Sequence, residues 1–174
     1  ILPGSTEEVQ AIVKTCNRYK LKYKAHSTGW IFGATPVFEG IIILDMRRMN
    51  RILKIDQKNM YAVIEPYVIA SQLQAEAMKV GLNCNMIGAG AGCSPLAQST
   101  SMAGHGPASL YMGHASEVLL ALEWVMPNGE ILRTGSSGSG CGWFCGEGPG
   151  PSLRGIARGR SGASGKLGVF TKCA

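Results

Sequence analysis

The chain has 174 residues and a formal net charge of +6; 45% of its residues are hydrophobic and 16% are charged. This composition supplies enough apolar material for a core and excludes disorder over most of the chain. No apolar run reaches the roughly 18 residues that a membrane-spanning helix needs, and the moderate positive charge favours a phosphate-bearing ligand or partner without identifying it.

The first third of the chain predicts one helix followed by strands. Ser5 and Glu8 have the spacing of a capping box, and apolar residues then recur at helical intervals, which predicts an amphipathic helix over residues 6–19. The continuous apolar run over residues 41–45 is typical of a strand that is buried on both faces. Shorter strands are expected at residues 22–25, 52–55 and 61–65.

The rest of the chain predicts a helix over residues 71–80, a stretch of low periodicity over residues 86–113, and a hairpin. Asn128 and Gly129 follow a predicted strand that ends at Met126. They predict the hairpin turn, because an Asn-Gly pair supplies the positive φ that such turns demand. The two strands of the hairpin are expected at residues 117–126 and 130–133. After them we expect a flexible glycine- and serine-rich loop at 135–150, a short helix at 152–158, a loop at 159–168 and a last strand at 168–173.

The order of these elements predicts an α+β fold with two lobes, a small one over residues 1–66 and a larger one over residues 67–174. Of the 24 glycines, 19 lie in residues 86–174, where they are spread over several loops. This distribution indicates repeated close approach of the backbone to a flat or anionic group, although a loop-rich lobe with many turns is the alternative.

The two ends of the chain and its six cysteines bear on its origin. The chain starts without an initiator Met or a signal-peptide pattern and ends in a strand-like alternation, so we expect a fragment of a longer protein. The cysteines have irregular spacings, so we expect reduced thiols in a cytoplasmic protein rather than a disulfide framework.

Several familiar sites are disfavoured by single residues. A dinucleotide fingerprint fails at Cys93, where a glycine is required, and a P-loop fails at Leu167, where a hydroxyl residue is required. Cys141 and Cys145 have no second cysteine pair, which disfavours a metal site. The basic residues are scattered and not interleaved with aromatic residues, so we expect no nucleic-acid partner.

Three loops remain, at residues 26–33, 88–106 and 162–168. Together with their flanking motifs they resemble the FAD-binding (PCMH-type) domain of the vanillyl-alcohol oxidase superfamily, which includes glycolate and D-lactate oxidoreductases. The opening segment 3–9 is similar to the family's first helix, and the closing segment 162–171 is similar to its Gly-Ser-Glu-Gly-Thr-Leu-Gly-Ile-Ile-Thr. Further matches lie at residues 44–52, 62–66 and 73–74, so the resemblance covers nearly the whole chain.

The resemblance implies that FAD lies extended between the two lobes, with the first loop around its pyrophosphate. Relatives usually carry Arg where His26 stands and Gly where Thr28 stands. Members that tether the flavin through this loop use a His at the position of Trp30, so we expect non-covalent FAD. The residues assigned to FAD binding are His26, Ser27, Thr28, Gly29, Trp30 and Gly33 in the first loop, Gly88, Ser94, Pro95, Gln98, Ser101, Gly104, His105 and Gly106 in the second, and Gly168 and Val169 in the third.

The resemblance further implies a flavin-dependent oxidoreductase that oxidises a small hydroxylated substrate, such as a 2-hydroxy acid of the D-lactate or glycolate type, by hydride transfer to the flavin. The family's substrate-side acids and bases come chiefly from a C-terminal cap domain, which we expect to lie outside this chain, so no catalytic residue is assigned. Two alternatives stay open: a non-catalytic flavin subunit that passes electrons to an iron–sulfur partner, and the same module in an ether-lipid synthase or a phenol oxidase.

Overall fold

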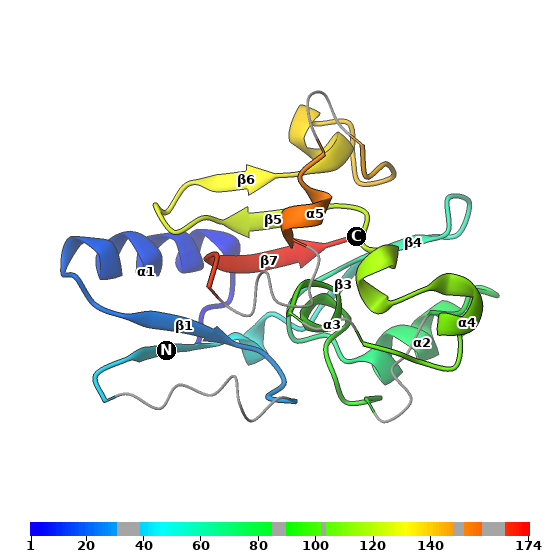
Figure 1. Ribbon diagram of the computed structural model, residues 1–174, viewed down its shortest axis with the longest axis horizontal. Coiled ribbons are helices and arrows are strands. Elements are labelled where there is room, and N and C mark those ends of the chain that lie inside the picture. Colours follow the sequence, from blue (N-terminus) through cyan, green and yellow to red (C-terminus); the bar gives the residue numbers. More distant parts are fainter. Residues whose placement is uncertain (31–38, 85–89, 102–103, 148–151, 158–165) are drawn as a thin grey trace.

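The computed structural model describes residues 1–30, 39–84, 90–101, 104–147, 152–157 and 166–174. Helices and strands are mixed along the chain, which confirms the expected α+β class (Figure 1). The strands are β1 (Tyr23–His26), β2 (Ile42–Asp45), β3 (Ile52–Asp56), β4 (Tyr61–Ile64), β5 (Leu122–Val125), β6 (Ile131–Arg133) and β7 (Val169–Cys173). The α-helices are α1 (Thr6–Arg18), α2 (Ala70–Met78), α3 (Pro95–Ser101), α4 (Ser109–Met112) and α5 (Arg154–Ala157), and the 3-10 helices are η2 (Met46–Arg48), η3 (Ala115–Val118) and η4 (Gly135–Ser139).

The strands form two sheets. β1 and β2 pair in parallel, and a five-stranded sheet has the order β3-β4-β7-β5-β6 with antiparallel neighbours. β7 is the last element of the chain, yet it lies between β4 and β5 in the middle of this sheet (Figure 1). β3 and β4 of this sheet precede residue 66, and β5, β6 and β7 follow it, so both predicted lobes contribute strands to one sheet. The division of the chain into two lobes at residue 66 stays a prediction.

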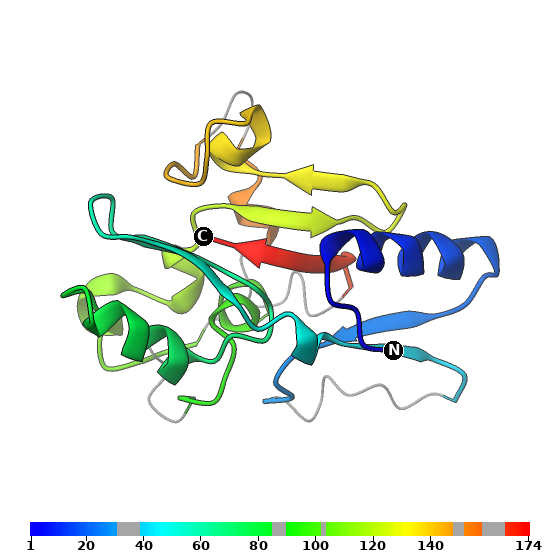
Figure 2. The ribbon, with the colours of Figure 1, turned by 180° about the vertical axis from the view of Figure 1, so that it is seen from behind.

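The first helix forms where the capping pattern predicts it. The Ser5 side chain accepts a hydrogen bond from the backbone N–H of Glu8 at the start of α1, and the Glu8 carboxylate accepts one from the N–H of Gly4. Val9 and Val13 are fully buried and join a core formed with β2, η2, β5 and β7. Figure 2 shows α1 and the β1–β2 pair at one end of the molecule and α2 at the other.

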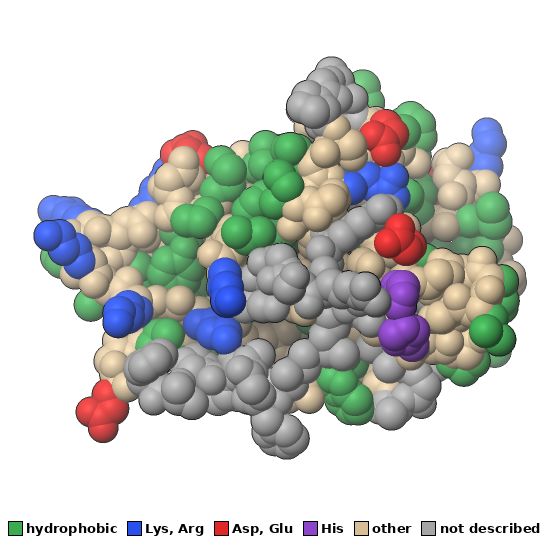
Figure 3. Space-filling view, in the orientation of Figure 1, with side chains coloured by type: hydrophobic (Ala, Val, Ile, Leu, Met, Phe, Trp, Pro, Cys, Tyr) green, Lys and Arg blue, Asp and Glu red, His purple; other side chains and the backbone are tan. Residues whose placement is uncertain are grey.

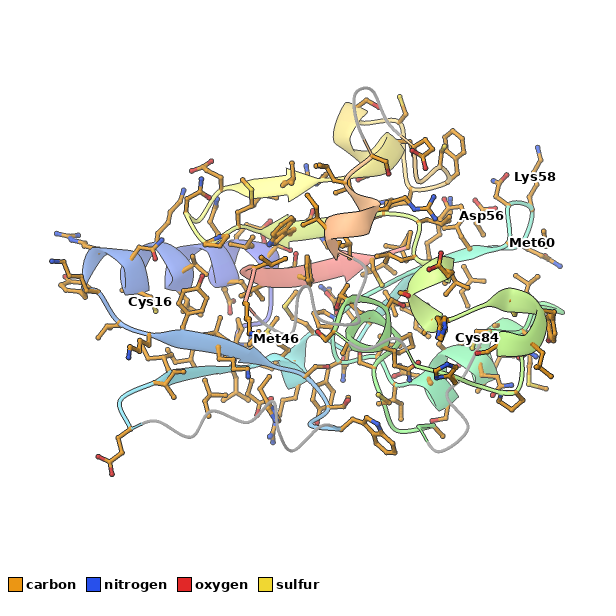
Figure 4. All side chains as sticks on the ribbon, in the orientation of Figure 1. Cys16, Met46, Asp56, Lys58, Met60 and Cys84 are labelled. Carbon is orange, nitrogen blue, oxygen red and sulfur yellow. The ribbon has the colours of Figure 1, made fainter. Side chains whose placement is uncertain are left out.

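The prediction that residues 41–45 form a strand buried on both faces is wrong in part. Leu44 is fully buried against α1, but Ile43 is 39% exposed. The reason is that β2 belongs to a two-stranded sheet, and within the described ranges only one of its faces packs on the core. Figure 4 labels Met46, just after β2, and Cys16 of α1; both are buried.

A second core lies under the other end of the five-stranded sheet. It is lined by α2, α3 and α5 and by the ends of β4, β5 and β7, with Leu73, Leu96 and Leu122 among its buried side chains. The β3–β4 turn projects from this end, and Met60 on it is 75% exposed (Figure 4). α3 therefore packs on this core through Leu96, and the residue before it, Ser94, contacts the first of the loops that the sequence assigned to FAD.

Three stretches differ from the expected secondary structure. The low-periodicity stretch contains α3 and α4, because the Ser94 hydroxyl caps α3 by accepting from the N–H of Ala97 and Leu96 is buried. β5 begins only at Leu122, because residues 117 and 118 belong to η3 and residues 119–121 form an irregular connection. The expected flexible loop after β6 instead contains η4, which is held by hydrogen bonds from the Ser136 hydroxyl to the carbonyls of Gly142 and Cys145.

The hairpin turn is confirmed, with φ of +85° at Gly129 and a hydrogen bond of 2.8 Å from its N–H to the carbonyl of Met126. Asn128 does not have a positive φ, so this is the longer kind of turn that needs a left-handed residue only at its last position. Across the described ranges, every helix is too short or too polar to traverse a bilayer.

Candidate functional site

The first predicted loop leaves β1 and is tied to two distant segments by its own hydroxyl groups. Ser27 Oγ donates a hydrogen bond of 2.5 Å to the carbonyl of Pro66, directly after β4. Thr28 Oγ1 accepts one of 3.2 Å from the backbone N–H of Ser94, at the start of α3. Gly29 follows with φ of +70°, a conformation that favours glycine. The first and second loops therefore lie against each other.

A permanent positive charge lies beside the start of this loop. His26 ends β1 and is the register partner of Asp45, which ends β2, so both side chains stand at the carboxyl edge of the parallel pair. The Arg47 guanidinium lies 2.5 Å from the Asp45 carboxylate. The hydrogen bond from Arg47 is the main reason that the pKa of Asp45 is lowered. Burial of the carboxyl group acts to raise this pKa, and the electrostatic effect of His26 acts to lower it.

Arg47 was not among the predicted site residues. Arg47 follows β2, the strand that pairs with β1, so its guanidinium, which is ion-paired with Asp45, lies near the end of β1 where His26 stands. A fixed cation at that place suits a phosphate group. The sequence feature that could have identified Arg47 is the pair Arg47-Arg48, which directly follows the apolar run of β2 and lies within the motif at residues 44–52.

The second predicted loop contains the helix α3, and several polar side chains at this helix are buried. Ser94 and Gln98 are buried, and the N–H of Gln98 donates to the carbonyl of Ser94 over 2.9 Å. The N–H of Ser94 is taken by Thr28, and that of Ala97 by the Ser94 hydroxyl. Pro95 and Ser101 begin and end α3. The second loop therefore contacts the first through the backbone of Ser94, and it offers few free backbone donors at its start.

Two polar side-chain atoms in this region are buried and have no hydrogen-bond partner among the described residues: Gln98 Nε2 and His114 Nδ1. The Cys93 thiol lies beside Gln98; burial raises its pKa, and the amide of Gln98 acts in the opposite direction. A thiol is only a weak acceptor, so the Gln98 amide still has donor capacity to spare. Atoms of this kind fit a ligand that carries hydrogen-bond acceptors, as the pyrophosphate and the ring carbonyls of FAD do.

The end of the second loop runs alongside the start of η3. Gly104 accepts a hydrogen bond of 3.1 Å from the N–H of Ala115, and the N–H of Gly106 donates to Ser109 Oγ over 2.9 Å. The His105 ring meets the His114 ring with centroids 4.2 Å apart and planes at 69°. His114 was not predicted as a site residue, because no motif connects it with His105 in the sequence.

The described end of the third predicted loop, residues 166–168, is fixed to β5. Trp124 Nε1 donates a hydrogen bond of 2.6 Å to the carbonyl of Leu167. Gly168 has φ of +102°, and a Cβ at this position would collide with the carbonyl of Val125. Val169 is buried in the core under α1. Gly33 and Gly88 lie outside the described residues, and Trp30, at the end of the described part of the first loop, is 42% exposed.

The cysteines and the ionisable side chains determine whether the described chain holds a disulfide bond or a metal site. All six cysteines, each of them in the described ranges, are free thiols. In those ranges, the side chains of His, Cys, Asp and Glu form no group of three or more that could hold a metal ion. The polar groups of the first two loops are thus the part of the described chain best suited to an anionic organic ligand.

Comparison with known proteins gives a consistent picture. Residues 1–135 match a family model described as FAD binding domain. The chain is 35% identical over 142 residues to the 4-cresol dehydrogenase [hydroxylating] flavoprotein subunit of Pseudomonas putida, covering 77% of this chain and 26% of that protein. It is 30% identical over 135 residues to a D-lactate dehydrogenase of Anaerostipes hadrus, covering 76% of this chain and 28% of that one.

The fold is also similar to solved structures. The crystal structure of p-cresol methylhydroxylase with substrate bound superposes with a TM-score of 0.83 and 30% sequence identity, over 99% of this chain and 34% of that chain. This match confirms the fold that the family resemblance implied. The chain spans only about a quarter of the length of the curated relatives named above.

Proposed function

The chain belongs to the family of FAD binding domains, and we propose that it is the flavin-binding part of an oxidoreductase that oxidises a small hydroxylated substrate. The observation that carries this proposal is the contact between Thr28 and Ser94. It joins two loops that are 66 residues apart in the chain and that the sequence independently assigned to one cofactor. The buried donor of Gln98 beside this contact supports the same assignment.

The described residues suggest how the cofactor is held. Backbone groups of residues 26–30 would line the pyrophosphate, with Arg47 supplying positive charge at the edge of β1 and β2. Gln98, Gly104 and Gly106 would contact the cofactor from the second loop, and Gly168 would allow the third loop to approach it closely. Bound FAD supplies a hydride acceptor, and the protein supplies orientation and electrostatics.

Two substrate classes have support. A 2-hydroxy acid of the D-lactate or glycolate type is our first candidate, supported by the similarity to a D-lactate dehydrogenase. A phenol with an oxidisable side chain is the second, favoured by the higher identity to the 4-cresol dehydrogenase subunit and by the close superposition on p-cresol methylhydroxylase. Both classes carry a hydroxyl group whose proton must leave when a hydride is removed.

The partner and the compartment are part of the proposal. The similar Pseudomonas putida protein is named a flavoprotein subunit, which supports a partner subunit or further chain that completes the active site here; an iron–sulfur partner is one form of it. We place the protein in the cytoplasm, on the support of its six free cysteines.

The test is spectroscopic. The protein is purified and its visible spectrum recorded, and we expect flavin bands and FAD released on denaturation. Anaerobic addition of D-lactate, glycolate or 4-cresol then bleaches the flavin with the substrate class that the protein uses. A colourless protein that releases no FAD overturns the cofactor assignment. With the full-length protein and any subunit that co-purifies with it, a yellow protein that none of the three bleaches overturns these two substrate classes and leaves cofactor binding in place.

A further inference from the structure

His105 and His114 meet edge to face at the end of the second loop. Their contact is built by the backbone, because the N–H of Ala115, next to His114, donates to the carbonyl of Gly104, next to His105. The Ser99 hydroxyl of α3 donates to the carbonyl of Ala115 over 3.0 Å and fixes the same turn from the other side. The two rings are thus held together by three segments of chain.

The two rings differ in access. His105 is exposed, whereas His114 is half-buried and its Nδ1 is enclosed without a hydrogen-bond partner among the described residues. Figure 3 shows histidine side chains at the surface of the face drawn there. A buried polar atom ordinarily has a hydrogen-bond partner, so His114 has hydrogen-bonding capacity that the described residues leave unused. The arrangement is that of an accessible imidazole backed by an enclosed one.

Of the described elements next to this pair, η3 and α4 carry one titratable side chain each and α3 carries none. η3 carries Glu117, whose N–H donates to the carbonyl of His114, and α4 carries Tyr111, which is 78% exposed. The seven residues of α3, which packs on η3, include no titratable side chain. Imidazole is the side chain suited to accept a proton near neutral pH, and the exposed ring of the pair is that of His105.

We propose that His105 is a catalytic base, which takes the hydroxyl proton of the substrate, and that His114 is a positioning residue, which holds the His105 ring. This inference rests on the proposed function, because it requires substrate and FAD to meet at the second loop. The substrate C–H bond breaks and its electron pair leaves as a hydride to FAD. The O–H bond breaks, and its proton passes to the unprotonated ring nitrogen of His105 and later to solvent, which reaches this exposed ring.

The first experiment follows flavin bleaching in the FAD-loaded protein after anaerobic mixing with whichever of D-lactate, glycolate or 4-cresol reduces it. His105→Gln slows bleaching by about 100-fold or more, since a general base contributes about that much. In the wild type the rate rises with pH as imidazole loses its proton, and in this variant the dependence is lost. His114→Asn slows bleaching by about 10-fold and keeps the pH dependence, because the base is still present. Tyr111→Phe, an exposed change on α4, leaves the rate unaltered.

The second experiment needs no turnover. The ring-proton NMR signals of the histidines are assigned in the FAD-loaded protein, and His114→Asn shifts the signal of His105 because an adjacent aromatic ring is removed. If the His105 signal does not shift in His114→Asn, the contact between the two rings is overturned. If His105→Gln bleaches at the wild-type rate with the wild-type pH profile, the role of His105 as catalytic base is overturned.

Cofactor content separates the remaining outcomes. Loss of FAD from His105→Gln alone would make His105 a cofactor-binding residue and overturn its role as base. A wild-type protein without FAD, or one that no substrate bleaches, would instead overturn the proposed function, and the inference with it.

Discussion

The carboxylate of Glu123 on β5 accepts a hydrogen bond of 2.7 Å from Thr6 Oγ1, at the first turn of α1 and 117 residues away in the chain. The same carboxylate accepts hydrogen bonds from Lys172 Nζ on β7 at 2.7 Å and from Arg133 Nε on β6 at 2.8 Å. One buried side chain therefore joins the first helix to three strands of the central sheet, and it does so on the sheet face that α1 covers.

Replacing this carboxylate should destabilise the fold. Glu123→Gln is expected to lower the free energy of unfolding by about 2–3 kcal/mol, because charge-assisted hydrogen bonds are lost while Lys172 and Arg133 can still reach water. Urea denaturation measures the change. Glu130→Gln is the matched control, since its ion pair with Lys14 is exposed at 3.5 Å, and we expect a change below about 0.5 kcal/mol. Equal effects of the two variants would contradict the role of Glu123.

The same residue predicts a loss of stability in acid. Burial acts to raise the pKa of Glu123, but hydrogen bonds from Lys172, Thr6 and Arg133 outweigh it and lower the pKa to about 2. A depressed carboxyl pKa stabilises the folded state fully above the unfolded value of about 4.3 and loses that contribution as the pH falls toward the folded value. Urea midpoints should therefore show the difference between wild type and Glu123→Gln shrinking from about pH 7 to about pH 3. If the difference in urea midpoint between the two proteins stayed constant over this pH range, the prediction that the Glu123 carboxylate is ionised in the folded state would be wrong.

Gly168 should tolerate no side chain. Gly168→Ala is expected to cost about 2 kcal/mol or more, because a left-handed backbone angle and a collision with the carbonyl of Val125 act together. Gly81→Ala is the control: its φ of +75° is similar but no atom lies within 4 Å of the added Cβ, so we expect about 1 kcal/mol. Thermal or urea unfolding distinguishes the two. Similar losses at both positions would mean that the contact with Val125 adds nothing.

Thr28 should matter for cofactor retention through its hydroxyl. Thr28→Val removes the acceptor for the Ser94 N–H at nearly constant volume, and we expect about a fivefold rise in the FAD dissociation constant, equivalent to the loss of one hydrogen bond. Thr28→Ser keeps the oxygen and should bind FAD as the wild type does. Flavin fluorescence on titration with FAD measures both. If Thr28→Ser is impaired as strongly as Thr28→Val, the methyl group and not the hydrogen bond is responsible.

The flavin should not be tethered through the first loop. Trp30 occupies the position at which a tethering relative would carry His, and an indole N–H is a donor without nucleophilic character. Acid precipitation separates the two cases, since free FAD stays in the supernatant and a tethered flavin colours the pellet. A yellow pellet whose flavin maps to residues 26–30 would show that the first loop is aligned wrongly with the family.

The sequence by itself determined the elements that depend on neighbouring residues. The capping pair Ser5 and Glu8 and the buried positions Val9 and Val13 define α1, because helical periodicity and end capping act within a few residues. Gly129 marks the hairpin turn for the same reason. The glycine-rich loops and their order along the chain also indicated the FAD-binding family before any contact was visible.

Only the tertiary structure decided which of these segments meet. α3 was missed because its small residues show no apolar period, and it forms through the Ser94 cap and the burial of Leu96. The contact between Thr28 and Ser94 joins the loop after β1 to the start of α3, and the contact between His105 and His114 joins the end of the second loop to the start of η3. Side-chain periodicity states which face of a segment is apolar, but not which distant segment covers it. That choice is made by the packing of the whole core, which here places the last strand, β7, between β4 and β5.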